Sequence, residues 1–373
     1  MPTHGSLSTT SAIRAILKQL DTKEQIHCLG FRSVGSKVLW DNPPFSVTRI
    51  LIPKRGERYF RFLFLPIIFL SGLMQLMLKK HKCIFVSFPD DVSLLCGYFL
   101  AVLTGKPLFP YMMDLYVETG VWAQPLDKWL QKQVFNKANR LVVINEGMQE
   151  YYHENYNIES ICLPHVFPRN PYPIKELKNS GDSFTIGYSG TINGARIAGL
   201  KRLKEALKDM PNVKMLYYSP QNENYLRNKG VWSEGFMQKN ITDTNELLDA
   251  LSRCDALFNP VYSGKIDRAQ IKTSFGGKMV EYLASGVPII IDSDEDFFTY
   301  KFMKNNKVGV LVAHNSAISL KKSIKFLQND PEFYYKMANS NLNLREYFSR
   351  EKMNEIFNNQ IIGNKRNKSD SIQ

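Results

Sequence analysis

Hydrophobic positions in the first half of the chain alternate between short runs typical of buried strands and longer stretches with helical spacing. Ile13, Ile16, Leu17 and Leu20 recur at helical spacing and predict a first helix over residues 9–20. The pattern then predicts strands at 83–89, 108–113, 140–145 and 160–166, and helices at 92–103, 125–138 and 146–152. Strands that alternate with helices at short spacing are typical of a mostly parallel, doubly wound sheet.

A second alternation of the same kind fills the rest of the chain. Strands are predicted at 184–189, 213–218, 231–236, 256–261, 287–292 and 308–312, and helices at 200–208, 246–254, 277–284, 317–327, 331–340 and 345–358. Both periodicities fail in the stretch rich in Pro, Lys and Asn that separates the two alternations, so a linker is predicted there.

The chain is therefore predicted to be an α/β protein with two doubly wound Rossmann-like domains that face a central cleft. The predicted parts are an N-terminal domain (1–170), a linker (171–183), a C-terminal domain (184–345), a helix that returns to the N-terminal domain (346–362) and a disordered tail (363–373).

One segment of the first domain, residues 58–81, is unusually apolar. It is almost free of polar residues over 62–78, contains Pro66 and Gly72, and has basic residues at both ends. A membrane-spanning helix needs roughly 20 apolar residues, and this run is shorter and includes Gln75. Three interpretations stay open: a core helix, a helix that lies in a membrane interface, and a spanning helix.

Composition narrows the possible partners. The 373 residues are 44% hydrophobic and 22% charged, which is typical of a globular protein with two domains. Lys and Arg (48) exceed Asp and Glu (35), which gives a net charge of +13 and favours an anionic partner such as a nucleotide or an anionic lipid surface. Nucleic acid would fit the charge alone, but no nucleic-acid-binding motif is present, so none is expected as a partner.

Cysteine and metal-ligand patterns are weak. The five cysteines are scattered without a CxxC pair, which favours a reducing compartment over a disulfide framework or a zinc site. No signal peptide is recognised at the N-terminus, so a cytoplasmic location is expected. Asp292 and Asp294 fit an Asp-x-Asp metal pattern, but a solvated turn is the simpler interpretation. No metal and no cofactor are expected.

The stretch 274–291 carries the clearest candidate chemistry. Gly276 and Gly277 open a short predicted helix, and their amides could approach a phosphate at its positive end. Lys278 and Glu281 are three residues apart and therefore share one face of that helix. A cation, a carboxylate and free amides on one surface suit a nucleotide. The alternative is a strand–helix–strand joint with a surface ion pair.

A glycine-rich segment follows the first strand of the second domain. Gly190, Gly194 and Gly199 predict a wide loop, and Arg196 and Lys201 could reach an anion from it. The spacing does not match the dinucleotide pattern G-x-G-x-x-G. Flexible surface glycines are the alternative interpretation.

Several elements, in one order, resemble the C-terminal domain of glycosyltransferase family 4, whose members are retaining enzymes with the GT-B fold. The elements are the glycine turn at 190, the segment Glu234-Gly-Phe-Met237, the strand Cys254-Asp-Ala-Leu-Phe-Asn-Pro260, and the helix with Glu281, Ala284, Gly286 and Pro288. In the first domain, residues 105–116, 138–145 and 163–166 are similar to elements of bacterial members that build surface polysaccharides.

The resemblance implies a role for individual residues. The implied catalytic residues are Asp114, Arg196 and Lys201, of which the two cations would bind the diphosphate. The implied donor-binding residues are Gly190, Thr191, Gly235, Phe236, Met237, Gly276, Gly277, Lys278 and Glu281, with Glu281 on the ribose. His4 and Gly5 would lie on the acceptor side.

The chain departs from the family pattern at three places. Thr273 stands where many members carry a second glutamate, and Thr191 stands where an arginine often follows the loop glycine. The chain also starts inside the loop that should follow the first strand, so that strand is expected to be missing.

The function that the resemblance implies is transfer of a sugar, with retention, from a nucleotide-sugar to a lipid-linked or saccharide acceptor in surface polysaccharide synthesis. Segment 58–81 would then dock the protein on the inner face of the cytoplasmic membrane. The alternative is a nucleotide-sugar- or sugar-binding protein of the same fold that has lost catalysis.

Overall fold

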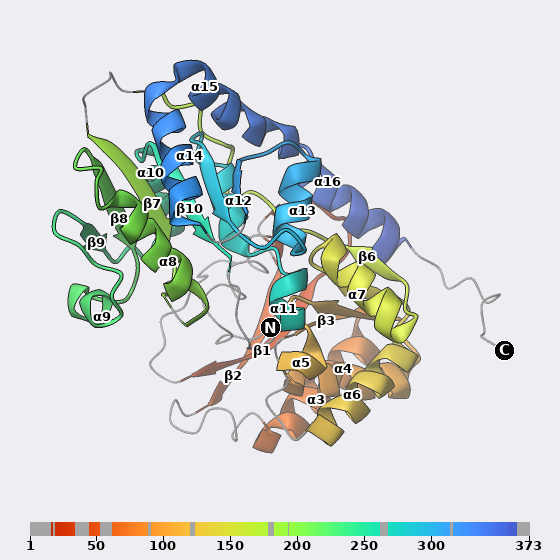
Figure 1. The fold of residues 1–373 in the computed structure, drawn as a ribbon. Coiled ribbons are helices and arrows are strands. Elements are labelled where there is room, and N and C mark those ends of the chain that lie inside the picture. Colours follow the sequence, from red (N-terminus) through yellow and green to blue (C-terminus); the bar gives the residue numbers. More distant parts are fainter. Residues whose placement is uncertain are drawn as a thin grey trace. The chain divides into compact units, whose positions relative to one another are not determined.

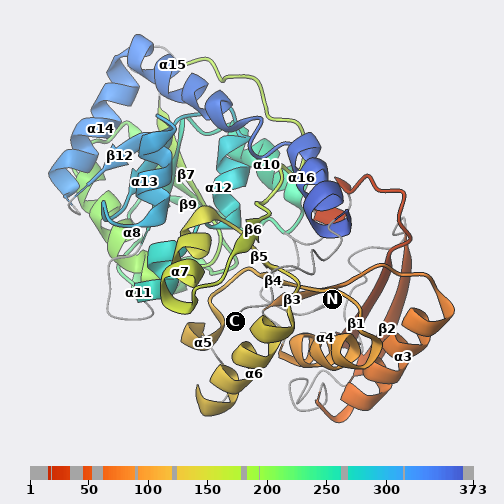
Figure 2. The same cartoon turned by 90° about the vertical axis from the view of Figure 1, so that its right-hand side faces the viewer.

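The chain divides into two compact units, each of which is described by itself (Figures 1 and 2). The computed structural model describes residues 16–17, 19–33, 45–52, 62–88, 91–119, 124–177, 183–192, 194–261, 268–313 and 316–363. Unit 1 consists of Met1–Val166 and Arg350–Gln373, and unit 2 of Phe167–Ser349. The C-terminal helix of the chain thus belongs to the same unit as the N-terminal half, whereas the predicted boundary at residue 170 falls inside unit 2.

Unit 1 contains a parallel four-stranded sheet in the order β3-β4-β5-β6, together with a parallel pair β1-β2. Its strands are β1 (His27–Ser33), β2 (Ser46–Ile52), β3 (Ile84–Phe88), β4 (Leu108–Met112), β5 (Leu141–Val143) and β6 (Ser160–Cys162). Its helices are α3 (Leu65–Leu78), α4 (Asp91–Thr104), α5 (Tyr116–Thr119), α6 (Gln124–Lys137), α7 (Glu146–Tyr156), α16 (Arg350–Ile356) and the π-helix η2 (Phe357–Ile362). In Figure 2, α4 lies between α3 and α6 and contacts both.

The strands and helices expected between residues 83 and 166 are confirmed, with ends that differ by a few residues. Of the first predicted helix, residues 16, 17, 19 and 20 are described, and the first three of these are helical. None of the helices in the described part of the chain combines the length and the apolarity needed to cross a membrane.

Unit 2 is a parallel six-stranded sheet in the order β12-β11-β10-β7-β8-β9. Its strands are β7 (Phe184–Ser189), β8 (Val213–Tyr218), β9 (Met237–Lys239), β10 (Ala256–Pro260), β11 (Ile289–Asp292) and β12 (Val310–Val312). Its helices are α8 (Gly194–Leu207), α9 (Glu223–Asn228), α10 (Thr244–Ser252), α11 (Arg268–Thr273), α12 (Gly277–Leu283), α13 (Phe298–Asn305), α14 (Ala317–Asn329), α15 (Pro331–Ser340) and the 3-10 helix η1 (Asn341–Leu344).

Side chains alternate between the two faces of this sheet and form two cores. Ile186, Phe258 and Ile290 pack with α8 and α14, whereas Leu257 and Ile289 pack with α10 and α12 (Figure 1). The near-continuous apolar runs of the strands follow from this burial on both faces, as expected for a parallel sheet. The predicted α/β class is confirmed.

Two predictions for unit 2 were wrong. The predicted strand at 231–236 is a turn, and the strand begins at Met237; Val231 and Trp232 are apolar because they pack beneath β8. The predicted glycine loop already becomes helix at Gly194. Gly199 lies inside that helix, where an added Cβ would stand 2.5 Å from the Cβ of Pro260, so this glycine permits close packing rather than a loop.

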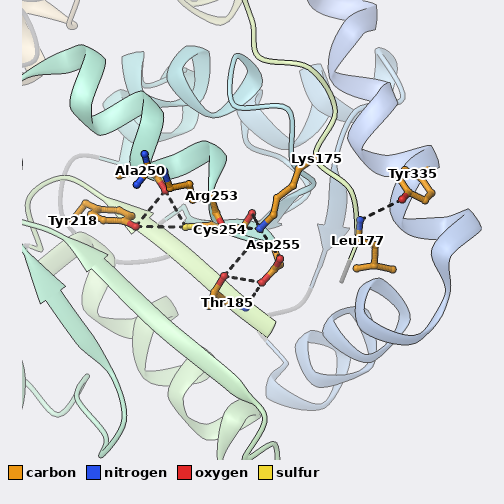
Figure 3. Close-up of polar contacts among 9 residues, drawn as sticks. All are labelled: Lys175, Leu177, Thr185, Tyr218, Ala250, Arg253, Cys254, Asp255 and Tyr335. Atoms are coloured by element: carbon orange, nitrogen blue, oxygen red, sulfur yellow. Dashed lines mark hydrogen bonds and ion pairs between the residues drawn. The ribbon is translucent and has the colours of Figure 1, made fainter. Parts of the chain in front are cut away.

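A strap of residues 167–177 attaches to unit 2, although its later part was predicted as linker. The amides of Tyr172 and Lys175 donate to the carbonyls of Ala284 (2.8 Å) and Gly286 (2.9 Å). Lys175 Nζ lies 2.6 Å from Oδ1 of the fully buried Asp255 and donates to two carbonyls at the end of α10, as Figure 3 shows. The strap has the composition of a linker, but its polar groups form hydrogen bonds with the rest of unit 2.

The other carboxylate oxygen of Asp255 accepts bonds from the amide and the hydroxyl of Thr185, both at 2.7 Å (Figure 3). One buried carboxylate therefore joins the strap, the start of β7 and the start of β10. These contacts lie at the amino ends of the strands and leave the carboxyl ends for a ligand.

Candidate functional site

The topology of unit 2 identifies one place in its sheet as special. From the central pair β7 and β10, the chain adds strands outward in opposite directions, β8 and β9 on one side and β11 and β12 on the other. In open parallel sheets, ligands bind at such a switch point, outside the carboxyl ends of the strands. Those ends are Ser189 of β7 and Pro260 of β10.

The loop after β7 is held firmly at this point. Gly190 has φ of +102°, a conformation that favours glycine, and its amide donates to Tyr218 O at 2.9 Å. The hydroxyl of Tyr188 donates to the carbonyl of Thr191 at 3.0 Å. A Cβ on Gly190 would meet no atom within 4 Å, so the loop borders open space.

Helix α8 places one of the two predicted diphosphate cations at the switch point. Arg196 lies in its first turn and donates from Nη1 to the carbonyl of Pro260 at 2.6 Å. Lys201 is exposed, and its Cε lies 3.3 Å from where a Cβ on Gly230 would stand. Five residues rotate a helix by about 140°, so the two cations leave α8 on different sides. Arg196 joins the candidate site and Lys201 does not.

Helix α12 supplies the other charged groups. Gly276 is its N-cap, is exposed, and would meet no atom within 4 Å if it carried a Cβ. The hydroxyl of Tyr282 accepts a bond from the amide of Ser189 at 2.8 Å and lies 3.5 Å from Phe258 O. Tyr282 thereby fastens α12 to β7 and β10, which brings Lys278 and Glu281 to the ends of these strands.

Lys278 stands above an aromatic ring beside a second cation. Its Nζ lies 4.4 Å from the centre of the Tyr188 ring, a cation–π contact. Burial holds the pKa of Lys278 well below its usual value, and the charge of Arg196 lowers it further, whereas Glu281 raises it. An anion that binds beside Lys278 would therefore stabilise its ammonium form.

Glu281 is shifted in the complementary direction. Burial raises the pKa of its carboxyl from 4.5 to about 7, and the charge of Lys278 partly opposes this rise. Arg196, Lys278 and Glu281 thus form a polar cluster whose charge a ligand can change. Strongly perturbed groups of this kind concentrate at binding and catalytic sites.

The remaining donor-side predictions lie elsewhere in unit 2. Gly235 (φ +81°), the partly buried Phe236 and Met237, which is 55% exposed, lead into the amino end of the edge strand β9. The carboxyl ends of β8 and β9 are Tyr218 and Lys239. The structure does not bring Gly235–Met237 to the edge where Lys278 and Glu281 lie.

Of the three site residues predicted in unit 1, one is described by the structure. Asp114 lies just after β4, partly buried, at the carboxyl edge of the unit 1 sheet. His4 and Gly5 lie outside the described residues.

Thr273 and Asp292, two further positions noted in the sequence, both form contacts with neighbouring residues. Thr273 is buried near the end of α11 and donates its hydroxyl to Ala269 O at 3.0 Å. Asp292 is buried against Arg202, whose Nη2 lies 2.6 Å from Oδ2, so this aspartate forms an ion pair. Within the described residues, no group of three or more His, Cys, Asp or Glu side chains could hold a metal ion.

Sequence reasoning missed Tyr188 as a member of the site. The residue is fully buried, carries Lys278 on its ring face and holds the glycine loop by its hydroxyl. An aromatic residue just before a glycine turn was the available signal. Its contact with Lys278 joins residues ninety positions apart, which no local pattern reveals.

Comparison with known proteins finds similarity at the level of structure. No protein-family model and no curated protein matches the chain. HepE from Anabaena, solved with UDP and glucose, is 12% identical and superposes with a TM-score of 0.64 over 96% of each chain. A UDP-forming alpha,alpha-trehalose-phosphate synthase from Burkholderia vietnamiensis is 11% identical, with a TM-score of 0.61 over 90% of this chain and 94% of that one.

A third neighbour, described as a UDP-N-acetylglucosamine 2-epimerase from Listeria monocytogenes, is 12% identical, with a TM-score of 0.54 over 92% of this chain and 98% of that one. The similarity shows that the chain has the GT-B fold, as the sequence resemblance implied. At these identities it shows the fold alone.

Proposed function

We propose that this GT-B protein is a glycosyltransferase that moves a sugar, with retention, from a nucleotide-sugar to a saccharide or lipid-linked acceptor. The observation that carries the proposal is the convergence of Arg196, Lys278 and Glu281 at the switch point of unit 2. Two structural neighbours support the choice of donor, since one was solved with UDP and glucose and the other is named as UDP-forming.

In this proposal the diphosphate of the donor lies between Arg196 and Lys278. The backbone at Gly190 and Gly276 borders open space, and the amide of Gly276 is proposed as a further donor to the diphosphate. Negative charge builds up on the diphosphate as the bond to the sugar breaks, and fixed cations stabilise that charge. We assign to Lys278 the diphosphate contact that the resemblance implied for Lys201, because Lys278 lies over Tyr188 near the end of β7 and Lys201 lies near Gly230.

The charge of a bound donor would change the protonation of Lys278 and Glu281. An arriving diphosphate would raise the pKa of Lys278 by attraction and offset its repulsion with Arg196. A charged Lys278 in turn favours the carboxylate of Glu281, which can then accept hydrogen bonds from the ribose hydroxyls. Asp114 in unit 1 is proposed to act on the acceptor side, and the scheme uses no metal.

Substitution of Glu281 tests the donor site. We expect Glu281→Gln to weaken nucleotide-sugar binding about 10- to 100-fold, the usual effect of losing hydrogen bonds to a charged group. Thermal shift and calorimetry with a panel of nucleotide-sugars measure the change, and Glu332→Gln on the exposed face of α15 is the matched control. Unchanged affinity in a folded Glu281→Gln protein would contradict the site.

The products of the reaction test the activity. A transferase releases nucleoside diphosphate and joins the sugar to the acceptor, whereas an epimerase alters the sugar without needing an acceptor. Binding without turnover across donors and acceptors would favour the alternative of a nucleotide-sugar-binding protein. That alternative is consistent with Thr273, which stands where a second glutamate is often found and whose hydroxyl bonds within α11.

A further inference from the structure

Helix α3 of unit 1 leaves much of its apolar surface exposed. Only Ile68 and Gly72 are buried, and a Cβ on Gly72 would lie 2.8 Å from Leu100 Cδ1 on α4 and 3.1 Å from Leu29 Cδ1 on β1. The opposite face exposes a stripe of large apolar side chains at helical spacing: Leu63 (69%), Ile67 (49%), Leu70 (61%), Met74 (53%), Met77 (75%) and Leu78 (72%). The segment is therefore not a fully buried core helix, because one face of α3 packs on unit 1 and the other is exposed.

The neighbouring helix α4 extends the exposed apolar area. Phe99, Val102 and Leu103, at positions i, i+3 and i+4, are 43%, 52% and 62% exposed. Leu100 between them packs on Gly72, so the exposed faces of α3 and α4 flank one helix–helix contact (Figure 2). We call these nine exposed side chains, Leu63 just before α3 and eight on α3 and α4, the docking surface.

Such an area is costly in water, because exposed apolar surface is disfavoured by about 25 cal/mol per Å². Single exposed apolar residues are common, but a contiguous apolar area of this kind marks a binding surface. Its composition is aliphatic and thioether-rich, and the helix Leu65–Leu78 carries no charged residue at all.

Positive charge borders the docking surface. Lys79 and Lys80 follow α3 directly, and both are exposed. Lys82 is exposed as well and pairs with Glu24 at 2.6 Å. An apolar face with lysines at its border matches an anionic bilayer, where apolar side chains enter the acyl boundary and ammonium groups meet acidic headgroups.

We propose that unit 1 binds the surface of an anionic lipid bilayer through the docking surface, with α3 lying in the plane of the interface. From Leu63 to Leu78 the exposed stripe is about 22 Å long at 1.5 Å per residue, shorter than the roughly 30 Å of a bilayer's hydrocarbon core. A helix of this length lies along the interface. Lys79 and Lys80 then contact headgroups at one end of the stripe.

Vesicle co-sedimentation without nucleotide-sugar tests the proposal independently of the proposed activity. The full chain should sediment with phosphatidylcholine vesicles that contain phosphatidylglycerol, and much less with phosphatidylcholine alone. Leu70→Gln combined with Met74→Gln should lower the partition coefficient about tenfold or more. Both side chains are largely exposed, so the fold should be retained. Ile318→Gln on α14, where the side chain is 82% exposed, is the matched control and should bind as the wild type does.

Two further experiments test the role of the bordering lysines and the possibility that the docking surface binds a second copy of the chain. Lys79→Gln and Lys80→Gln should each weaken binding to the anionic vesicles about fivefold, whereas Lys336→Gln on α15 should have no effect. Equal binding by the Leu70→Gln/Met74→Gln protein would overturn the proposal. A wild-type dimer in sedimentation velocity that this double variant dissolves, without vesicle binding by either protein, would also overturn it and assign the surface to a second copy of the chain.

Discussion

Glu281 and Lys278 illustrate how a small group of residues can be tuned by its surroundings. Each is an ordinary surface residue type, yet burial moves both pKa values toward the neutral forms. Their shared helix face was evident from their spacing in the sequence. The direction of the pKa shifts was not, because burial causes both of them and Arg196, from another helix, lowers the pKa of Lys278 further.

The shift of Glu281 predicts a pH dependence of stability in the ligand-free protein. Below pH 4.5 its carboxyl is protonated in both the folded and the unfolded chain. Between pH 4.5 and about 7 the unfolded chain releases the proton while the folded chain keeps it, so the contribution of Glu281 to folding stability falls as pH rises. Above about pH 7 that contribution is constant.

Glu281→Gln should remove this decline, since glutamine stays neutral. The melting temperature of the variant relative to the wild type should therefore rise steadily from pH 4.5 to about 7, as differential scanning fluorimetry can measure. The same series with Glu332→Gln, at an exposed position, should run parallel to the wild type. If the melting temperature of Glu281→Gln also ran parallel to that of the wild type, the carboxyl of Glu281 would not be held neutral in the folded protein.

Among the elements, α8 shows most clearly how packing overrides a local pattern. Three glycines within ten residues favoured a loop, but the helix begins at Gly194 and includes Gly199. Glycine at 199 lets α8 approach the end of β10 and thus brings Arg196 to Pro260. Because the helix begins at Gly194, both Arg196 and Lys201 lie on it, and helical geometry places their side chains on different sides of α8. Arg196 therefore reaches the candidate site and Lys201 does not.

Gly199→Ala should therefore disturb both stability and binding. The added methyl would lie 2.5 Å from Pro260 Cβ and 3.1 Å from Asp292 Oδ2, and overpacking of this kind costs about 1–3 kcal/mol. Urea unfolding should show the loss, and nucleotide-sugar affinity should fall as Arg196 shifts. Gly194→Ala is the control, because its methyl would meet no atom within 4 Å. Equal stability of the two variants would contradict the close approach of α8.

Strands of the two sheets were predicted well for a physical reason. Buried parallel strands are short, apolar and β-branched, and such runs stand out from the helices between them. The same rule failed at Val231 and Trp232, which are apolar because a turn packs them under β8. Hydrophobicity reports burial, and burial alone does not distinguish a strand from a packed turn.

For the whole molecule, the repeated alternation of strands and helices predicted the division into two units. It did not predict the residue at which unit 2 begins. Residues 167–177 are rich in proline and polar groups, as linkers are. Their partners, among them Asp255, Ala284 and Gly286, lie 80 to 112 residues further along the chain, so no local sequence pattern indicates these contacts. The strap belongs to unit 2 through these contacts.

Lys175→Met should destabilise unit 2 through its effect on Asp255. The buried carboxylate would lose the ammonium that pairs with it, and removing one partner of a buried ion pair costs about 3–5 kcal/mol. Hydrogen exchange should increase at the amides of Tyr172 and residue 175, and urea unfolding should shift to lower concentration. Lys301→Met, at an exposed position of α13, is the control. Protection equal to the wild type at these amides would contradict the anchoring role of Lys175.

Both covalent connections between the units leave unit 2 at one place. The chain passes from unit 1 to unit 2 at Val166 and returns at Arg350. Next to these points, the amide of Phe167 donates to the carbonyl of Phe348 at 3.0 Å, and the two rings pack at 5.8 Å. The first and the last residues of unit 2 are therefore joined by a hydrogen bond and a ring contact, so the two chain crossings start from one fixed point of this unit.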